Sequence, residues 1–157
     1  MAWANSKMFR RTLSELFSNT QAWDFDVDAM KVALYNNTGT PDADATTDAL
    51  QSYNGAGSAW VVANEVTGTN WAAGGVALAG QTISVANSLR VVFDATDTAS
   101  PANTTVAGTF GCLLYDTVTL GSANRGVSFH YFGGTQSVTA GTFTIIWHAN
   151  GIINCTL

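Results

Sequence analysis

The N-terminal segment carries a helical pattern of hydrophobic positions between Ser6 and Ser18. Apolar side chains recur there at near-helical spacing: Met8, Phe9, Leu13, Leu16 and Phe17. Polar side chains fill the positions between them: Lys7, Arg10, Arg11, Ser14 and Glu15. This alternation predicts an amphipathic helix. We expect Asn5 or Ser6 to cap its first turn, and Asn19 and Thr20 to end it.

Beyond this helix the pattern changes to short apolar runs separated by turn-forming residues, which is typical of strands. The predicted strands are Lys31–Asn36, Ala59–Val66, Val76–Ala79, Thr82–Val85, Leu89–Asp94, Phe110–Tyr115, Gly126–Phe132, Thr142–His148 and Ile152–Thr156. The acidic, Gly- and Ala-rich stretch Pro41–Gly57 predicts a long surface loop, with one helical turn at Thr46–Leu50.

The turn signals complete the prediction of the fold. Asn150-Gly151 is the strongest hairpin signal, because both residues accept a positive φ, and it predicts that the last two strands pair. Gly80-Gln81 predicts another tight turn. Short strands at near-regular spacing, without strand–helix alternation, indicate a mainly β fold: a single antiparallel β-sandwich or jelly-roll-like domain with one N-terminal α-helix. The predicted domain covers residues 1–157, with residues 1–20 as its N-terminal helical segment.

The amino-acid composition favours a protein that works as a subunit of a larger assembly. Hydrophobic residues make up 46% of the 157 residues and charged residues 11%, a low share of charge for a globular chain. The polar balance comes from neutral Thr, Ser, Asn and Gly, which suits a surface that neighbouring subunits cover. The net charge of −5 argues against a nucleic-acid partner, which would need a basic stripe. The basic residues Lys7, Arg10 and Arg11 gather near the N-terminus.

Localisation signals are weak along the chain. The N-terminus lacks the continuous apolar run and small-residue cleavage site of a secretory signal, so we expect a chain made in the cytoplasm. Its apolar runs fall far short of the ~20 residues that span a bilayer, which argues against a membrane partner. In a chain made in the cytoplasm we expect buried free thiols at Cys112 and Cys155, which lie in apolar strand-like runs.

An acidic triplet is the best candidate for a metal site. Asp24, Asp26 and Asp28 begin like a calcium-binding loop, but that loop needs Gly at its sixth position and Glu at its twelfth, where Ala29 and Tyr35 stand. On a strand the three carboxylates would share one face and either bind a cation or remain solvated. We expect solvation and predict no metal site.

Candidate catalytic residues are equally sparse. His130 and His148 are the chain's two histidines, both within predicted strands, and the sequence lacks the Gly-x-Ser-x-Gly pattern that exposes a nucleophilic serine. The Cys and His residues also lack the short spacing of zinc ligands. The sequence therefore predicts a non-enzymatic protein, with no catalytic residues and no cofactor, rather than a small hydrolase.

The stretch from Asn64 to Gly75, NEVTGTNWAAGG, resembles a pattern of small tailed-bacteriophage virion proteins: Glu-Val-x-Gly-x-Gly-aromatic-x-x-Gly-Gly. Asn70 stands where that pattern has Gly before the aromatic residue, so the turn there is expected to differ. The resemblance continues through four further stretches: Val92–Ala95, Gly111–Asp116, Phe132–Val138 and Thr142–Ile153. The similarity spans nearly the whole chain and implies a structural protein of the virion, without catalytic residues.

Two roles within a virion are compatible with this resemblance. The first, which we favour, is a capsid decoration (cement) protein on the outer surface of the head, which stabilises the shell. Its partners would be the major capsid protein and further copies of itself, for example in a trimer. The alternative is a minor tail or tail-tip, fibre-like binding module that contacts the host surface.

The N-terminal segment is the predicted contact with the neighbouring subunits. Aromatic residues, Met and Arg are enriched at interface cores, and a terminal segment can extend without breaking a sheet. The predicted interface residues are Trp3, Lys7, Met8, Phe9, Arg10 and Arg11. A second interpretation is that the helix covers one open end of the sandwich with Leu13, Leu16 and Phe17.

Overall fold

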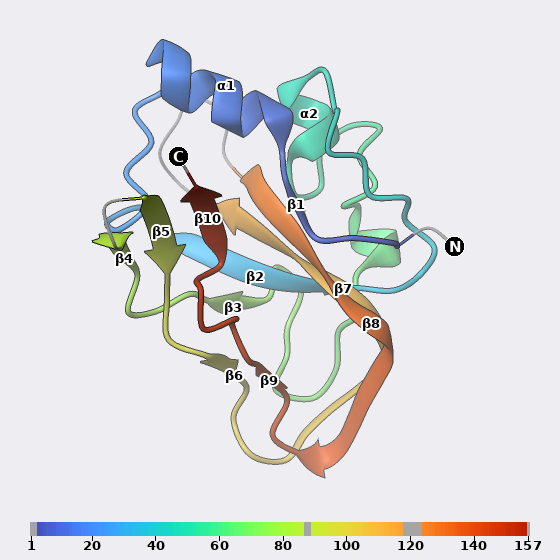
Figure 1. Ribbon diagram of the computed structural model, residues 1–157. Helices are drawn as coiled ribbons and strands as arrows, with labels where there is room; N and C mark the ends of the chain where they lie inside the picture. The colour runs from blue at the N-terminus through green and yellow to red at the C-terminus, as the bar shows by residue number, and fades with distance from the viewer. Residues whose placement is uncertain (1–2, 87–88, 118–123, 157) are drawn as a thin grey trace.

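The largest element of the protein is a five-stranded antiparallel sheet (Figure 1). A computed structural model describes residues 3–86, 89–117 and 124–156. In spatial order the strands of the sheet are β1 (Lys7–Met8), β8 (Arg125–Gly141), β7 (Thr104–Asp116), β2 (Met30–Tyr35) and β3 (Val76–Ala77). The long strands β7 and β8 pair along most of their length and form the centre of the molecule.

Two smaller antiparallel sheets cover one face of this sheet. One has the order β10 (Ile153–Thr156), β5 (Arg90–Asp94) and β4 (Thr82–Ala86); the other pairs β6 (Thr98–Ala99) with β9 (Thr144–Ile145). A hydrophobic core joins the two layers; among its buried members are Val32, Leu34, Leu114, Phe93 and Ile145. The arrangement is sandwich-like.

The opposite face of the five-stranded sheet is covered by the N-terminal segment and by the chain between β2 and β3. That connection contains α2 (Asp48–Gln51) and the 3-10 turn η1 (Val62–Asn64). A second core lies here and includes Ala33, Tyr35, Leu113, Trp3 and Trp60. Because residues 32–35 of β2 and 112–115 of β7 are buried on both faces, their sequences are continuous apolar runs rather than alternating patterns.

The predicted fold class is confirmed: the protein is mainly β, its sheets are antiparallel, and an α-helix, α1 (Arg10–Ser18), lies near the N-terminus. In Figure 1 this helix lies across one end of the strands. None of the helices within the described residues combines the length and hydrophobicity needed to cross a membrane.

The predicted start of the helix is wrong, because α1 begins at Arg10 rather than near Ser6. Lys7–Met8 instead forms β1 along the edge of β8. The first amide of the helix, on Arg10, donates to the Ala43 carbonyl oxygen at 3.0 Å, so neither Asn5 nor Ser6 caps it. Pairing with a distant strand overrides the local helical pattern.

The connection between β2 and β3 differs from its prediction. Ala59–Val66 is not a strand; it contains η1 and meets β2 at a single bridge between Glu65 and Tyr35. Pro41–Gly57 is not a surface loop throughout, because Ala43 and other members cover the second core. The predicted helical turn is confirmed, since α2 overlaps it.

The hairpin predicted at Asn150-Gly151 is also wrong. Gly151 has the expected positive φ of 90°, so a turn does form there. However, β9 before it pairs with β6, whereas β10 after it pairs with β5. Likewise β3 and β4, predicted to flank a tight turn, belong to different sheets. Local turn signals identify where the chain bends but do not determine which strands pair.

Candidate interaction surface

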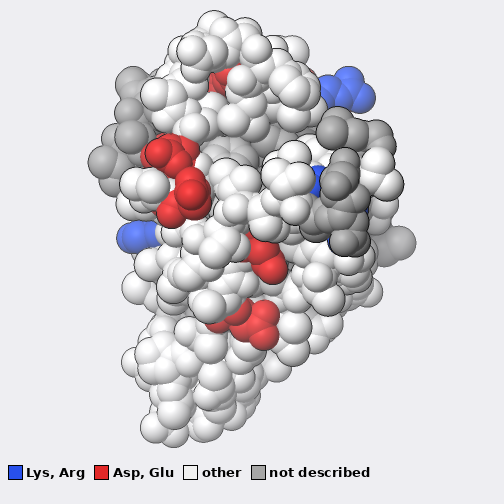
Figure 2. All heavy atoms as spheres, turned by 60° about the vertical axis from the view of Figure 1, so that its left-hand side comes forward, with Lys and Arg blue, Asp and Glu red and all other residues white. Residues whose placement is uncertain are grey.

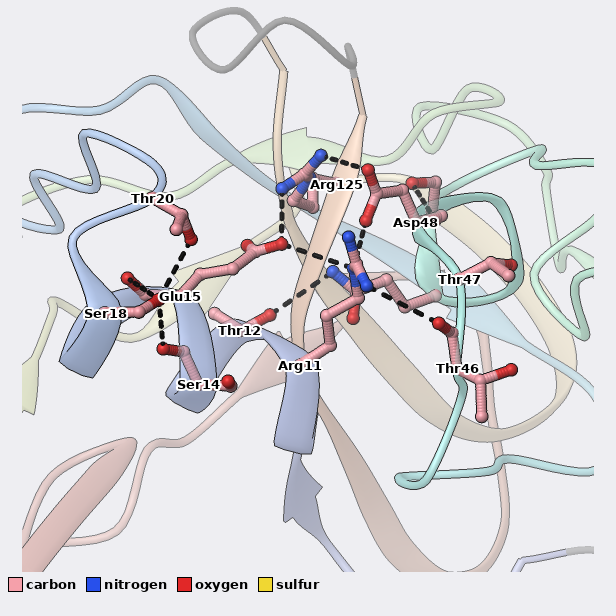
Figure 3. A network of polar contacts seen from close by, with 12 residues as sticks. Arg11, Thr12, Ser14, Glu15, Ser18, Thr20, Thr46, Thr47, Asp48 and Arg125 are labelled. Carbon is pink, nitrogen blue, oxygen red and sulfur yellow. Dashed lines mark hydrogen bonds and ion pairs between the residues drawn. The ribbon is translucent and has the colours of Figure 1, made fainter.

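A buried ion cluster ties α1 to the sheet and to α2 (Figure 3). The guanidinium of Arg125, on β8, is 1% exposed and lies between two carboxylates, with Nη1 2.7 Å from Glu15 Oε1 and Nη2 2.5 Å from Asp48 Oδ2. Arg11 pairs with the same two carboxylates from the rim of the cluster. Thr12 Oγ1 donates at 2.8 Å to a carbonyl oxygen of β8. Sequence analysis missed this cluster because its members lie far apart in the chain.

The face of α1 that packs against the domain is therefore polar. Its buried side chains are Thr12 and Glu15, whereas Leu13 is half-buried and Leu16 and Phe17 are exposed. Phe17 is 84% exposed, the largest value among the exposed large hydrophobic side chains of the described residues. The interpretation that these apolar residues cover the end of the sandwich is wrong for Leu16 and Phe17, because the ion cluster turns the polar side of the helix inward.

The three-stranded sheet presents a second set of apolar side chains, of which Ile83, Val85, Val91 and Cys155 are exposed and Phe93 is buried. The strand register places Ile83 beside Phe93 and Phe93 beside Ile153. Two residues further along, Val85 lies beside Val91, and Val91 lies beside Cys155. Because side chains alternate along a strand, all six point to the same face of the sheet.

Helix and sheet meet at an apolar groove of about 220 Å³, whose lining includes Leu13 and Leu16 from α1, and Ile83, Val91 and Cys155 from the sheet. We call the exposed apolar residues on and beside this groove the apolar surface: Leu16, Phe17, Ile83, Val85, Val91 and Cys155. Asp24, which is exposed, also lines the groove. Figure 2, which brings β4 and β5 forward, shows mostly uncharged atoms, with several acidic groups and a few Lys or Arg side chains among them. Apolar surface of this kind marks sites of interaction with other molecules.

Two of the predicted interface residues, Trp3 and Phe9, lie in the domain's own core. Trp3 is 1% exposed and Phe9 is fully buried. The Trp3 ring meets Trp60 edge to face, with 5.7 Å between the ring centroids, and its Nε1 donates to the Asn36 carbonyl oxygen at 2.9 Å. In the folded chain neither aromatic side chain is free to contact a neighbour.

The other four predicted interface residues do not form one patch. Lys7 and Arg10 are exposed, and Arg10 forms a surface ion pair with Asp44 at 2.7 Å. Arg11 is half-buried in the ion cluster, and Met8 is half-buried along the apolar groove. The N-terminal segment thus contributes to the apolar surface mainly through the end of α1.

The acidic triplet lies in a turn rather than on a strand. Asp28 is buried, and its Oδ2 accepts a hydrogen bond from the Asp24 amide at 2.8 Å. A side-chain hydrogen bond with Asp26, followed by desolvation and the neighbouring carboxylates, raises the pKa of Asp24. Within the described residues, no group of three or more His, Cys, Asp or Glu side chains is arranged to hold a metal ion.

The histidines and cysteines occupy different environments. His130 Nε2 lies 2.9 Å from Ser128 Oγ, and desolvation by burial lowers the pKa of His130 to about 4. Cys112 is buried as predicted, and desolvation raises the pKa of its thiol. The prediction is wrong for Cys155, which is an exposed free thiol because β10 is an edge strand.

The stretch Asn64–Gly75, which carries the family resemblance, forms a structural clip. Glu65 Oε1 accepts from the Gly74 amide at 2.7 Å and its Oε2 accepts from the Tyr53 hydroxyl at 2.8 Å. Desolvation raises the pKa of Glu65 against these hydrogen bonds, which lower it. The clip ends at Gly75, where an added Cβ would lie 1.9 Å from a backbone oxygen of β2.

Asn70, where the resembling pattern has Gly, keeps a turn that suits glycine. Its φ is 62°, in the left-handed region that Gly and Asn tolerate best. Its Nδ2 donates to the Ala102 carbonyl oxygen at 3.2 Å, and the adjoining Trp71 is completely buried. The turn at Asn70 therefore helps to anchor Trp71 in the core.

Comparisons with protein-family models, with curated proteins and with solved structures find no match to this chain. Inferences about its role therefore depend on the geometry described above and on the patterns in its sequence.

Proposed function

We propose that this chain is a structural protein of a tailed-phage virion, and specifically a decoration protein bound to the outer surface of the head. The observation that carries the proposal is the apolar surface, which α1 and the three-stranded sheet leave uncovered. Contiguous exposed apolar area is typical of a surface that another protein covers. The resemblance of the sequence to small phage virion proteins supports the same class.

The proposed partners are the major capsid protein and further copies of this chain. Among the described residues, Asp24 is the one charged residue in the lining of the groove, so covering the apolar surface desolvates few charges. A subunit present in many copies can also be retained by modest contacts that act together. In this role the protein adds contacts to a capsid shell that the major capsid subunits already close without it.

Removing the chain from the phage tests this role. We expect heads that still assemble but withstand heat and osmotic shock less well than the parent particles. Heads of ordinary resistance combined with lost adsorption to the host would contradict the proposal and support the tail role instead.

Substitutions within the apolar surface test the contact itself. Phe17→Asp combined with Val85→Asp places two carboxylates on exposed positions, so the fold is expected to keep its melting temperature while occupancy on the head falls at least about tenfold. Val62→Asp is the matched control, since Val62 is 46% exposed on η1, away from this surface. Unchanged occupancy of the double variant would exclude the apolar surface as the contact.

A further inference from the structure

A second and larger groove lies along the outer edge of β8. Its volume is about 570 Å³, and it shares no lining residue with the apolar surface. One wall consists of β8 residues, among them Tyr131, Phe132 and Gln136; the other is the chain segment 143–148. Its size falls within the range of about 300–1,000 Å³ that is typical of ligand sites.

The lining residues show that this groove follows the edge of the sheet. Tyr131 and Phe132 are consecutive, so their side chains point to opposite faces of β8. A cavity that touches both must pass along the strand's edge rather than lie over one face. Ser6, at the end of the N-terminal segment's contact with this edge, is also part of the lining.

That edge of β8 is mostly free of strand partners. β1 pairs there with Ser128 and Phe129, and the next contact is the hydrogen bond from the Tyr131 amide to Ser6 Oγ at 3.0 Å. From Phe132 to Gly141, no strand among the described residues pairs with this side. On the other side β7 pairs with Gln136, Val138 and Gly141, and the segment between Tyr131 and Gln136 is an irregularity of the ladder that includes Gly133 at φ 78°. A free strand edge offers backbone donors and acceptors to an added strand.

The opposite wall also offers contacts to an occupant. Ile146 follows β9 and is 77% exposed, with its side chain on the groove. The rings of His130 and Trp147, one from each wall, meet with centroids 5.2 Å apart and close the groove at its base. The walls are thus joined at the bottom and open toward solvent.

The chemistry of the lining selects an uncharged occupant. None of its residues is Asp, Glu, Lys or Arg. Its polar side chains include the Gln136 amide and the Ser6 hydroxyl, which are neutral donors and acceptors, and the imidazoles of His130 and His148, among aromatic and aliphatic side chains. A charged side chain placed here would lose hydration without gaining a partner of opposite charge.

We propose that this groove binds an extended, uncharged peptide segment of another protein chain, which adds to the free edge of β8 as a strand. Main-chain hydrogen bonds to β8 supply affinity, and alternate aliphatic side chains of the peptide contact Ile146 and Phe132. The chain's own N-terminal segment already adds to the same edge as β1, at Ser128 and Phe129. The inference is independent of the particle role, since it depends on this groove alone.

A peptide library tests the inference with the full chain. The probes are acetylated, amidated heptapeptides built from Gly, Ala, Ser, Thr, Val and Ile, with a matched set that carries Asp or Lys at alternate positions. Added to ¹⁵N-labelled protein, the uncharged peptides are expected to shift the amide signals of residues 131–136 and 144–148. The charged set is expected to bind at least tenfold more weakly.

Two matched variants localise the binding. Ile146→Asp changes an exposed residue of the groove and is expected to weaken binding of the best peptide at least tenfold. Val85→Asp changes a side chain that is 75% exposed on the other surface and is expected to leave that binding unchanged. The inference is overturned if no uncharged peptide binds, if the shifts appear elsewhere, if Ile146→Asp binds as tightly as the parent, or if methyl glycosides bind in place of peptides.

Discussion

At the scale of single residues, the charged side chains expected to contribute most to stability are buried. Arg125 is buried between Glu15 and Asp48, whereas Arg10 and its partner Asp44 are largely exposed. Breaking a buried ion pair leaves an uncompensated charge in the interior, whereas an exposed pair is screened by water. Substitution of Arg125 is therefore expected to lower the free energy of unfolding much more than substitution of Arg10.

Arg125→Ala is expected to lower the free energy of unfolding by about 3–5 kcal/mol, because Glu15 and Asp48 lose their buried partner. Arg10→Ala is the matched control and is expected to lower it by less than about 1 kcal/mol. Urea unfolding measures both values. Equal effects of the two substitutions would contradict the interpretation of the buried cluster.

His130 predicts how stability depends on pH. Its folded pKa of about 4 lies below its ordinary value of 6.5, so the unfolded chain binds the proton more tightly. The stability that the neutral form of His130 contributes is fully present above pH 6.5. It decreases as the pH falls from 6.5 towards 4 and is lost below about pH 4.

The expected loss from His130 is at most about 3 kcal/mol, and it is measured by urea unfolding at pH 7 and pH 4.5. His130→Gln is expected to show a smaller difference between the two pH values than the parent. His148→Gln controls for the change of residue type at an exposed histidine. A parent-like pH difference in His130→Gln would contradict this assignment.

Trp3 shows that residue type alone does not determine whether a side chain lies in an interface or in the domain core. Its chemistry suits an interface core as well as a domain core, and its position near the terminus favoured the interface. The structure buries it against Trp60 and Phe129 because β1 pairs with β8 and carries the preceding segment onto that face. The choice between the two environments depends on a pairing between residues more than 100 positions apart, which local patterns do not encode.

At the scale of elements, the Asn64–Gly75 clip makes a prediction about two glycines with nearly equal backbone angles. Gly75 has φ 71° and an added Cβ would meet the Val32 carbonyl oxygen at 1.9 Å. Gly108 has φ 76° and an added Cβ would meet nothing within 4 Å. The pair separates the cost of backbone strain from the cost of a clash.

Gly108→Ala is expected to destabilise the fold by about 1–2 kcal/mol, the cost of the left-handed conformation alone. Gly75→Ala is expected to cost about 1–3 kcal/mol more, because β2 must also move away from the new methyl group. Thermal or urea unfolding of both variants measures the difference. Similar costs for the two substitutions would show that the clip does not depend on this close approach.

Strand positions were predictable where burial is strong, and strand partners were not. The apolar runs in β2, β5 and the second half of β7 identified these strands, since each buries several side chains. Ala59–Val66 is equally apolar, but its Trp60 enters the second core from an irregular segment. Asn150-Gly151 has the geometry of a turn, yet β9 and β10 find partners elsewhere because pairing is decided by contacts over the whole sheet.

At the scale of the whole molecule, both faces of the central sheet are covered, and most of the exposed large hydrophobic side chains lie on α1 and the three-stranded sheet. The sequence predicted the mainly β class and an assembly role from its low charge. It did not predict this surface, because the helical pattern placed Leu16 and Phe17 against the domain. The ion cluster of Glu15, Arg125 and Asp48 turns the polar side of the helix inward, so that Leu16 lies on the apolar groove and Phe17 faces solvent.

The central claim is that a partner covers the apolar surface in the assembled particle, and Cys155 offers a direct measurement of it. Cys155 is exposed within this surface, whereas the other cysteine, Cys112, is buried and serves as an unreactive internal control. The rate at which a maleimide labels Cys155 is measured on the free chain and on particles that carry it. The account predicts rapid labelling of the free chain and strong protection on the particle, and equal rates in the two states would contradict it.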